Sequence, residues 1–221
     1  MKNQPDPTRI IEGLRDTGYT FNTSVADIID NCISHGKAKN VWLDISMDYD
    51  GEISLTITDD GSGMNEIGLI NAMKYGSNNL SNPKSLGKFG MGMKTASSAF
   101  CRRYSLISRD DVKNKFKKLT WDLDHVSKVN DWDMLEEPLT DSENKIWGKY
   151  LDKDSGTIVQ WEKVDRIIRE FHLAGGKFAK NALDRKIDNL EFHLGMVYQQ
   201  FIDRKFNDYA DIQIKVNDKI I

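Results

Sequence analysis

Two oxygen-bearing side chains, Asp27 and Asn31, stand four residues apart in a run with helical periodicity. Side chains at this spacing lie on the same face of a helix, so the carboxylate and the amide would point the same way. Both groups offer the oxygen atoms that Mg²⁺ prefers, which indicates a site for a metal-bound phosphate group. The alternative is a solvated helix face, and Asp30, on the outer side of the same helix, fits that alternative best.

A second candidate group begins at Asp59, which follows the apolar run 53–58 and precedes Gly61, Gly63 and Met64. A carboxylate at a strand end can accept a hydrogen bond from an exocyclic amine in a buried pocket. The alternative is a turn, because Asp-Asp-Gly is a common way for a chain to leave a strand. The two glycines fit either a tight turn or the close approach of a flat ligand.

The third candidate is a glycine-rich loop, residues 87–94, that runs into a predicted helix start. Backbone N–H groups near Gly90 and Gly92 favour an anion, and the charge of Lys94 would neutralise it. The segment is not a P-loop, because one residue too many separates the glycine from the lysine and no strand immediately precedes it. A Rossmann fingerprint is excluded because no Gly-x-Gly-x-x-Gly occurs, and a flexible hinge remains the alternative.

The composition bounds the class of protein. The chain has 221 residues, a length sufficient for one domain or one and a half with a sizeable core. Its net charge is −3. No window reaches the roughly 18 uninterrupted apolar residues of a membrane helix, and the N-terminus lacks a signal-peptide pattern, so we expect a cytoplasmic protein without membrane contact. Cys32 and Cys101 have neither the number nor the spacing for a disulfide framework or a zinc site, so we expect buried free thiols.

One local feature leaves nucleic-acid binding open. Four lysines crowd one predicted hairpin: Lys113, Lys115, Lys117 and Lys118. The negative net charge argues against a surface that is basic throughout. A solvated strand turn is the alternative for this hairpin.

Periodicity predicts the elements that must position these groups. Helical spacing predicts helices between Pro7 and Gly18, between a cap at Asn22, Thr23 or Ser24 and Gly36, and over residues 65–74, 91–99 and 181–205. Alternating runs predict strands over residues 41–45, 53–58, 104–108, 116–123, 157–161 and 212–216. Residues 75–87, rich in Gly, Ser and Asn, read as a mobile loop.

The C-terminal pattern leads to an expectation about the length of the protein. After the strand at 212–216, Asn217-Asp218 predicts a turn, and the chain stops at Ile220-Ile221, at the start of a returning strand. We therefore expect an N-terminal fragment of a longer protein. A natural end with a frayed hairpin is the alternative.

Taken in order, four motifs resemble those of the GHKL superfamily, which includes gyrase B, Hsp90, histidine kinases, the MutL proteins and the MORC ATPases. The first is an acid, three residues and Asn, present as Asp27 and Asn31 in SVADIIDNCISHG. The second is Asp-x-Gly-x-Gly at 59–63, and the third is the Gly-x-Gly at 90–92 in GKFGMGMKTAS, which closes a mobile lid. The fourth is the Gly-Thr pair at 156–157 in SGTIVQW, and the whole match covers roughly residues 19–165.

The resemblance implies roles for these residues in an ATP site. Asp27 would be the general base for water, Asn31 the Mg²⁺ ligand, Asp59 the acceptor for the adenine amine and Thr157 a second adenine contact. Gly90, Gly92 and Lys94 would hold the phosphates. The nucleotide-binding set is completed by Gly61, Gly63, Met64, Lys88, Phe89, Met91 and Met93.

The same resemblance implies a fold and a function. The fold would be an α/β two-layer sandwich of the Bergerat type, with a mixed, mostly antiparallel sheet and helices on one face. Residues 1–180 would form the ATP-binding domain, with a lid at about 75–92 that looks nearest to the MORC and Hsp90-like branch. Residues 181–221 would be a long helix and the start of a truncated second domain, which in relatives supplies a lysine to the γ-phosphate. The function would be Mg²⁺-dependent ATP hydrolysis that drives a conformational switch, with a clamp that dimerises when ATP is bound.

One departure from the pattern keeps a rival function open. The base of the superfamily is usually Glu, and Asp27 is one methylene shorter, so its reach to a water molecule is reduced. A nucleotide-binding module that does not hydrolyse ATP is therefore one alternative. A histidine kinase is the other, although only about 20 residues precede the site and the four histidines have no phospho-acceptor context.

Overall fold

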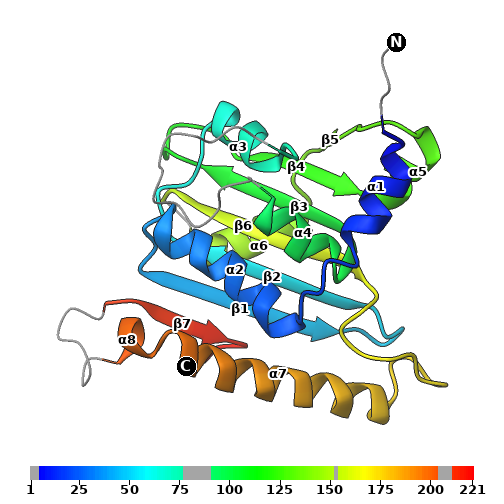
Figure 1. The fold of residues 1–221 in the computed structure, drawn as a ribbon. Helices are drawn as coiled ribbons and strands as arrows, with labels where there is room; N and C mark the ends of the chain where they lie inside the picture. Colours follow the sequence, from blue (N-terminus) through cyan, green and yellow to red (C-terminus); the bar gives the residue numbers. More distant parts are fainter. Residues whose placement is uncertain (1–4, 77–90, 152–153, 204–210) are drawn as a thin grey trace.

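The computed structural model describes residues 5–76, 91–151, 154–203 and 211–221. Residues 77–90, the main part of the predicted lid with Lys88, Phe89 and Gly90, lie outside the described residues. Within them, eight strands form one open sheet in the order β5-β4-β3-β6-β2-β1-β7-β8 (Figure 1). The strands are β1 Asn40–Met47, β2 Ile53–Asp59, β3 Cys101–Arg109, β4 Lys117–Asp122, β5 Leu135–Glu136, β6 Gly156–Val164, β7 Gln213–Val216 and β8 Lys219–Ile220.

The sheet is mixed and mostly antiparallel, as expected. Neighbouring strands pair antiparallel except β1 and β7, which run parallel with Val41 opposite Ile214. A parallel pair needs a crossover, and the long helix before β7 provides it. Asn217 and Asp218 have positive φ angles of 46° and 66°, which is the geometry of the tight turn that returns the chain into β8.

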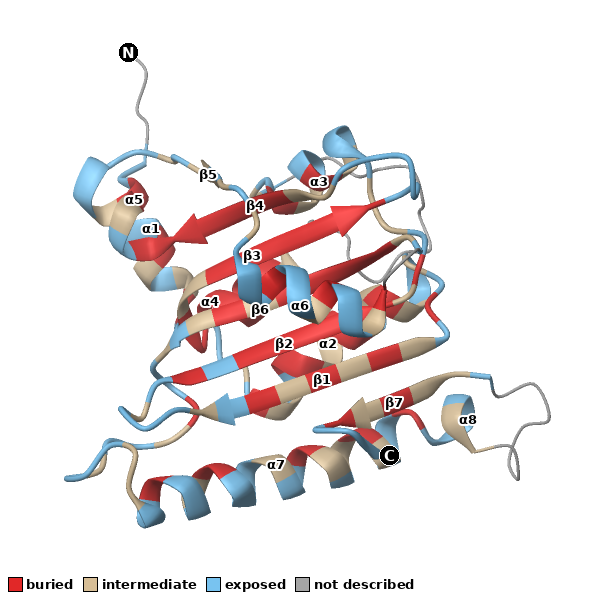
Figure 2. Cartoon of the chain, turned by 180° about the vertical axis from the view of Figure 1, so that it is seen from behind, coloured by how far each residue is buried: buried red, intermediate tan, exposed pale blue. Residues whose placement is uncertain are grey.

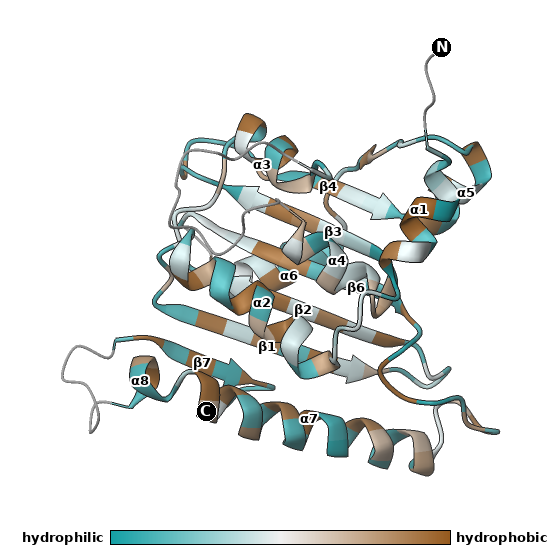
Figure 3. Ribbon diagram, viewed as in Figure 1, coloured by the Kyte–Doolittle hydropathy of each residue, from teal (hydrophilic) through white to brown (hydrophobic). Residues whose placement is uncertain are grey.

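Alternation along the strands divides the core between the two faces of the sheet. Leu43, Leu55 and Val159 belong to the main apolar cluster, whereas Ile107 and Ile158, one position out of phase on β3 and β6, belong to a smaller second cluster. Successive side chains of a strand point to opposite faces, so both faces are covered. Figure 3 shows brown apolar residues alternating with paler and teal polar residues along strands such as β1 and β7.

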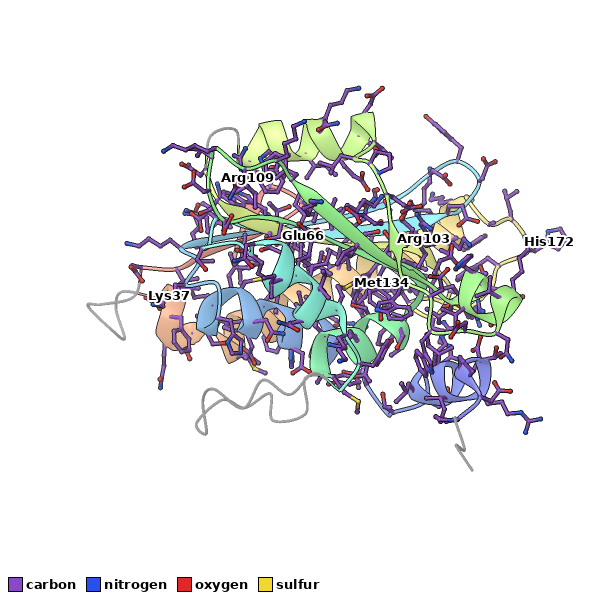
Figure 4. All side chains as sticks on the ribbon, turned by 90° about the horizontal axis from the view of Figure 1, so that it is seen from above. Lys37, Glu66, Arg103, Arg109, Met134 and His172 are labelled. Atoms are coloured by element: carbon purple, nitrogen blue, oxygen red, sulfur yellow. The ribbon has the colours of Figure 1, made fainter. Side chains whose placement is uncertain are left out.

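Most helices cover the face with the main cluster. The helices are α1 Pro7–Leu14, α2 Phe21–Ser34, α3 Glu66–Met73, α4 Gly92–Ser98, α5 Leu123–Val129, α6 Asp141–Tyr150, α7 Lys177–Val197 and α8 Gln199–Ile202. The exception is α6, whose Trp147 packs with Ile107 and Ile158 on the opposite face (Figures 2 and 4). The α/β fold class is confirmed, with this one helix on the second face as an addition to the expected arrangement.

The sequence contained a signal for α6 that the periodicity analysis did not use. Thr140 and Glu143 form a capping box, in which the Thr140 hydroxyl accepts from the Glu143 N–H and the Glu143 carboxylate accepts from the Thr140 N–H. Two orphan donors of the helix start are satisfied in this way. Glu143 is buried and also forms an ion pair with Lys118 at 2.7 Å, which ties α6 to β4.

The start of α2 differs by a few residues from the expectation. Its N-cap is Thr20, which forms a capping box with Thr23, and not Asn22, Thr23 or Ser24. Thr20 lies two to four residues before the predicted cap positions, and its β-region backbone suits a cap. The helix buries Val25, Ile28, Ile29 and Cys32 in the core, whereas Ile33 is only partly buried.

The long C-terminal helix also has different bounds. The predicted helix over 181–205 begins earlier, at Lys177, and α7 ends at Val197, where Tyr198 leaves helical geometry and α8 begins. Tyr198 is buried, and its phenol donates to the Ala26 carbonyl and to Asp30 of α2. This contact explains the break, because it anchors the end of α7 to α2 instead of allowing the helix to continue.

Two further expectations concern the membrane and the thiols. No described helix is long and apolar enough to cross a membrane. Cys32 and Cys101 are both free and buried, which confirms the prediction for them.

The packing of α7 generates a first test. Leu190 is fully buried against the main core, so Leu190→Ala should lower the free energy of unfolding by about 2–5 kcal/mol. Phe192, two positions further along the same helix, is 70% exposed, so Phe192→Ala should change it by no more than about 0.5 kcal/mol. Urea unfolding measures both values. Equally small effects would mean that α7 belongs to a unit separate from the core of α2, as the predicted boundary at 180/181 implies.

Candidate functional site

The face of α2 that carries Asp27 and Asn31 turns toward the start of α4. The Asn31 side-chain amide donates to the Asp27 carbonyl at 2.8 Å, one turn back along the helix. A Cβ placed on Gly92 would lie 3.3 Å from Asp27 Oδ2, so the first residue of α4 is in contact with this carboxylate. The structure therefore brings together the first motif and the second glycine of the third motif.

Tyr19 is the functional candidate that the sequence analysis missed. Its phenol donates to Asp27 Oδ2 at 2.6 Å. Burial, followed by the hydrogen bond to Asp27, raises the pKa of the Tyr19 phenol to about 12, so the phenol is a donor at neutral pH. No periodicity or motif marks Tyr19, and its position directly before the cap of α2 was the only signal available.

The other end of α2 reaches Asp59. This carboxylate is 4% exposed, accepts a hydrogen bond from the Gly61 N–H at 2.9 Å, and lies beside the Cys32 thiol and beside Gly36, just after α2. Burial raises its pKa to about 6, although the Gly61 N–H and Cys32 act in the opposite direction. A carboxylate held this deep in the fold, with no cationic partner among the residues that the structure describes, is typical of a binding site and not of a solvated turn.

A row of polar side chains continues from Asp59 across the sheet. Thr157 of β6 is the direct partner of Asp59 on β2, and Ser108 of β3 is the partner of Thr157. The hydroxyls of Thr157 and Ser108 are hydrogen-bonded at 2.9 Å, and Ser108 also accepts from the Met64 N–H at 2.9 Å. Ser108 was not predicted, because register between strands distant in sequence placed it in this row.

The glycines of the second motif have reasons within the chain. A Cβ on Gly61 would lie 2.5 Å from the Gly36 carbonyl oxygen, and one on Gly63 would overlap the Arg109 carbonyl. Gly63 also has a φ of +61°, which residues with a side chain rarely adopt. These glycines let the loop after β2 pack between the end of α2 and the end of β3, so their presence is explained without a ligand. Arg109 itself points to the opposite face, over the ring of Phe116 beside α6 (Figure 4).

Lys94 is buried beside the end of α3. The residue is 3% exposed, and its ammonium donates to the Ala72 carbonyl at 2.7 Å, with the Tyr75 ring 5.8 Å away. Burial lowers the pKa of Lys94 to about 8. The role of Lys94 in neutralising phosphates stays a prediction, and in this structure its ammonium is bonded to the Ala72 carbonyl. Its neighbours Met91 and Met93 are partly buried, as the N-cap of α4 and as a side chain packed on the main core.

The two halves of the site are joined by α2. Asp27 contacts Gly92, and Gly36 contacts Asp59, nine residues further along the chain. Asp27 stands seven residues before the end of α2 at Ser34, which corresponds to about 10 Å of helix at 1.5 Å per residue, and this separation suits an elongated ligand with different groups at its two ends. The buried acceptor lies at one end of this span and the oxygen ligands at the other.

The metal expectation can be compared with the donors present. Among the described residues, no group of three or more His, Cys, Asp or Glu side chains could hold a metal ion by itself. A divalent cation at Asn31 would therefore need further oxygen ligands, which phosphates and water provide. The residues thus fit Mg²⁺ that arrives with a nucleotide and do not form a separate protein cage.

The lysines of the predicted basic hairpin differ in their surroundings. Lys117 forms ion pairs with Glu136 at 3.1 Å and with Glu66 at 3.5 Å, and Lys118 is buried against Glu143. Two of the four lysines are therefore neutralised by acids of this chain. This weakens the nucleic-acid interpretation and favours the solvated turn.

Comparison with known proteins agrees with the motifs. A family model described as "Histidine kinase-, DNA gyrase B-, and HSP90-like ATPase" matches residues 19–157. The match begins at Tyr19 and ends at Thr157, so it contains all four motifs. A comparison with curated proteins found no match.

The buried carboxylate leads to a stability prediction. The pKa of Asp59 rises from 3.8 to about 6 on folding, so ionisation of this buried carboxyl lowers the stability of the folded state as the pH rises from about 4 through 6. Asp59→Asn removes the cost of the buried charge and keeps an oxygen for the Gly61 N–H. The free energy of unfolding without nucleotide should increase, by up to about 3 kcal/mol at pH 7.5 and by about 1 kcal/mol less at pH 5. Urea unfolding at both pH values measures the difference.

Asp60→Asn is the matched control. Asp60 Oδ2 accepts from the Asn40 side-chain amide at 2.6 Å. In Asp60→Asn the new NH₂ group would face the NH₂ group of Asn40, so that two donors would stand against each other. This substitution should lower the free energy of unfolding, by about 1 kcal/mol. A loss of stability in both variants would show that Asp59 is a structural turn residue.

Proposed function

Because the chain belongs to the family of histidine kinase-, DNA gyrase B- and HSP90-like ATPases, we propose that it binds ATP along α2 and hydrolyses it with Asp27 as general base. The observation that supports this most directly is the span of α2, which contacts Gly92 at Asp27 and reaches Asp59 just after its other end. A nucleotide placed along this helix would have its base at Asp59 and its phosphates at Asp27 and Asn31.

At the base end, the row of Asp59, Thr157 and Ser108 would read the adenine. The Asp59 carboxylate would accept from the exocyclic amine, and the Thr157 hydroxyl would supply a second contact. Thr157 is 8% exposed and Asp59 is 4% exposed, so a ligand that bound to these two side chains would displace little water from them. The hydrogen bond between the hydroxyls of Ser108 and Thr157 would keep the Thr157 side chain in place. Gly61, Gly63 and Met64 would then form the wall of the base pocket.

At the phosphate end, the Asn31 amide oxygen would be the protein ligand of Mg²⁺, which would neutralise phosphate charge when bound. The bond from the Asn31 NH₂ to the Asp27 carbonyl fixes which atom of the amide remains for a cation. Asp27 would accept a proton from the attacking water. The water oxygen would bond to the γ-phosphorus while the bond to the bridging oxygen of ADP breaks.

The use of the hydrolysis is the finer part of the proposal. We infer a conformational switch, with a clamp between two copies of the chain when ATP is bound. Support comes from Gly92, which closes the predicted lid and lies 3.3 Å, at its Cβ position, from Asp27. A change in the phosphate groups beside Asp27 would therefore alter the surroundings of Gly92, the residue at the end of the predicted lid. The assignment of phosphate contacts to Lys88, Phe89, Gly90, Met91 and Met93 remains part of this proposal.

Two other functions predict different results. A module that only binds nucleotide would show ATP affinity without turnover. A histidine kinase would transfer the γ-phosphate to a histidine. Of the four histidines in the chain, His125 is hydrogen-bonded through Nε2 to Asp133 at 2.7 Å. Incubation with γ-labelled ATP separates the three, because only the ATPase releases phosphate and only the kinase labels protein.

Substitution of the base gives the next prediction. Asp27→Asn should leave the Kd for ATP within about threefold and lower kcat by a factor on the order of 100 or more, because the amide cannot take up a proton. Phosphate release and calorimetry measure the two quantities. Asp30→Asn is the matched control, since Asp30 is an exposed acid on the same helix, and its turnover should stay unchanged. Full turnover in Asp27→Asn would remove Asp27 from the proposed role.

The base pocket gives a prediction about nucleotide choice and pH. Asp59 accepts from the adenine amine only when it is ionised, so ATP affinity should fall several-fold as the pH drops from 7.5 to 5.5, through the pKa of about 6. Asp59→Asn should weaken ATP binding about tenfold at pH 7.5, which is about 1.4 kcal/mol, and should remove the pH dependence. GTP should bind more weakly than ATP, because its carbonyl would face the carboxylate. Calorimetry that finds equal affinities for the two nucleotides would contradict the assignment of Asp59.

A further inference from the structure

Two acids of α2 each accept a hydrogen bond from one phenol. Tyr19 donates to Asp27 Oδ2 at 2.6 Å, and Tyr198 donates to Asp30 Oδ1 at 2.7 Å. The chemistry of the two pairs is the same, but their surroundings differ. Asp27 is partly buried and contacts Gly92, whereas Asp30 is exposed.

The Tyr19 phenol is held from three sides. Tyr19 directly precedes Thr20, the cap that starts α2, so its backbone is fixed at the helix entrance. The side chain is partly buried and packs on the main core. Its hydroxyl also lies close to the side chain of Thr95 of α4. The phenol therefore links the entrance of α2, the carboxylate of Asp27 and the first turns of α4.

The two carboxylate oxygens of Asp27 consequently have different surroundings. Oδ2 accepts from the Tyr19 hydroxyl and lies 3.3 Å from the position that a Cβ on Gly92 would occupy. The second torsion of an Asp side chain is broad, so a carboxylate without such a contact would rotate freely. A hydrogen bond on Oδ2 selects one orientation and leaves Oδ1 as the oxygen for another partner.

We propose that Tyr19 is a positioning residue for hydrolysis: its phenol holds Asp27 Oδ2, so that Oδ1 takes the proton of the attacking water. The inference rests on the proposed function, because it assumes Asp27 as the base. It also accounts for the short side chain, since a fixed orientation offsets part of the reach that one methylene would add. A general base has to stand within about 2.6–3.2 Å of the proton donor, so its orientation matters as much as its length.

Tyr19→Phe tests the proposal, because it removes the hydroxyl and keeps the ring in its packing. We expect kcat to fall by a factor on the order of 10, while the Kd for a non-hydrolysable ATP analogue and the midpoint of urea unfolding stay unchanged. A merely structural role would change the unfolding midpoint and the affinity together. Tyr198→Phe is the matched control: it removes the same bond from Asp30, and its kcat should equal that of the unmodified chain.

A double variant shows whether Tyr19 acts through Asp27. In an Asp27→Asn chain, adding Tyr19→Phe should leave the residual kcat unchanged, because there is no base left to orient. A further tenfold loss in that background, or a normal kcat in Tyr19→Phe beside a lost kcat in Asp27→Asn, would overturn the inference and leave the proposed function standing. A normal kcat in Asp27→Asn itself would overturn the proposed function, and the role of Tyr19 with it.

Discussion

The packing of α2 on the sheet is the contact on which the remaining architecture depends. Val25, Ile28, Ile29 and Cys32 are buried against the strands, and this apolar stripe sets the rotation of the helix about its axis. With the rotation set, Asp27 and Asn31 turn toward α4 and Cys32 lies beside Asp59. A polar pair in mid-helix lowers helix propensity, so the burial of the stripe has to stabilise the helix against that cost. The candidate site therefore exists because an apolar surface holds a less favourable polar one in place.

The buried Asp59 shows the complementary constraint. Its carboxylate is inside the fold and accepts from the Gly61 N–H, and burial raises its pKa. A sequence optimised only for stability would place an amide or an apolar residue at this position. Retention of the acid fits a binding role, because functional sites commonly keep groups that cost stability.

Local pattern was sufficient for much of this fold. Alternation in 41–45 and 53–58 indicated the β1–β2 hairpin, and the spacing of Asp27 and Asn31 indicated one helix face, because both signals depend only on neighbours in sequence. Tyr19, Ser108 and the position of Lys94 depend on contacts between segments far apart in the chain. Ser108 faces Thr157 through the register of β3 and β6, and Lys94 reaches Ala72 through the packing of α4 beside α3. Such contacts leave no pattern among neighbouring residues of the sequence. The order of the motifs therefore indicated the type of candidate site but not all of the residues that surround it.

The bond between Tyr198 and α2 has a mechanical consequence. Tyr198 stands at the junction of α7 and α8, and its phenol is bound both to the Ala26 carbonyl and to Asp30. A translation of α2 along its axis would either carry this junction with it or break both bonds. The two bonds thus tie the junction of α7 and α8 to α2, and the Ile212 N–H, which donates to the Phe201 carbonyl at 3.3 Å, continues this connection from α8 to the strand pair β7–β8 at the edge of the sheet.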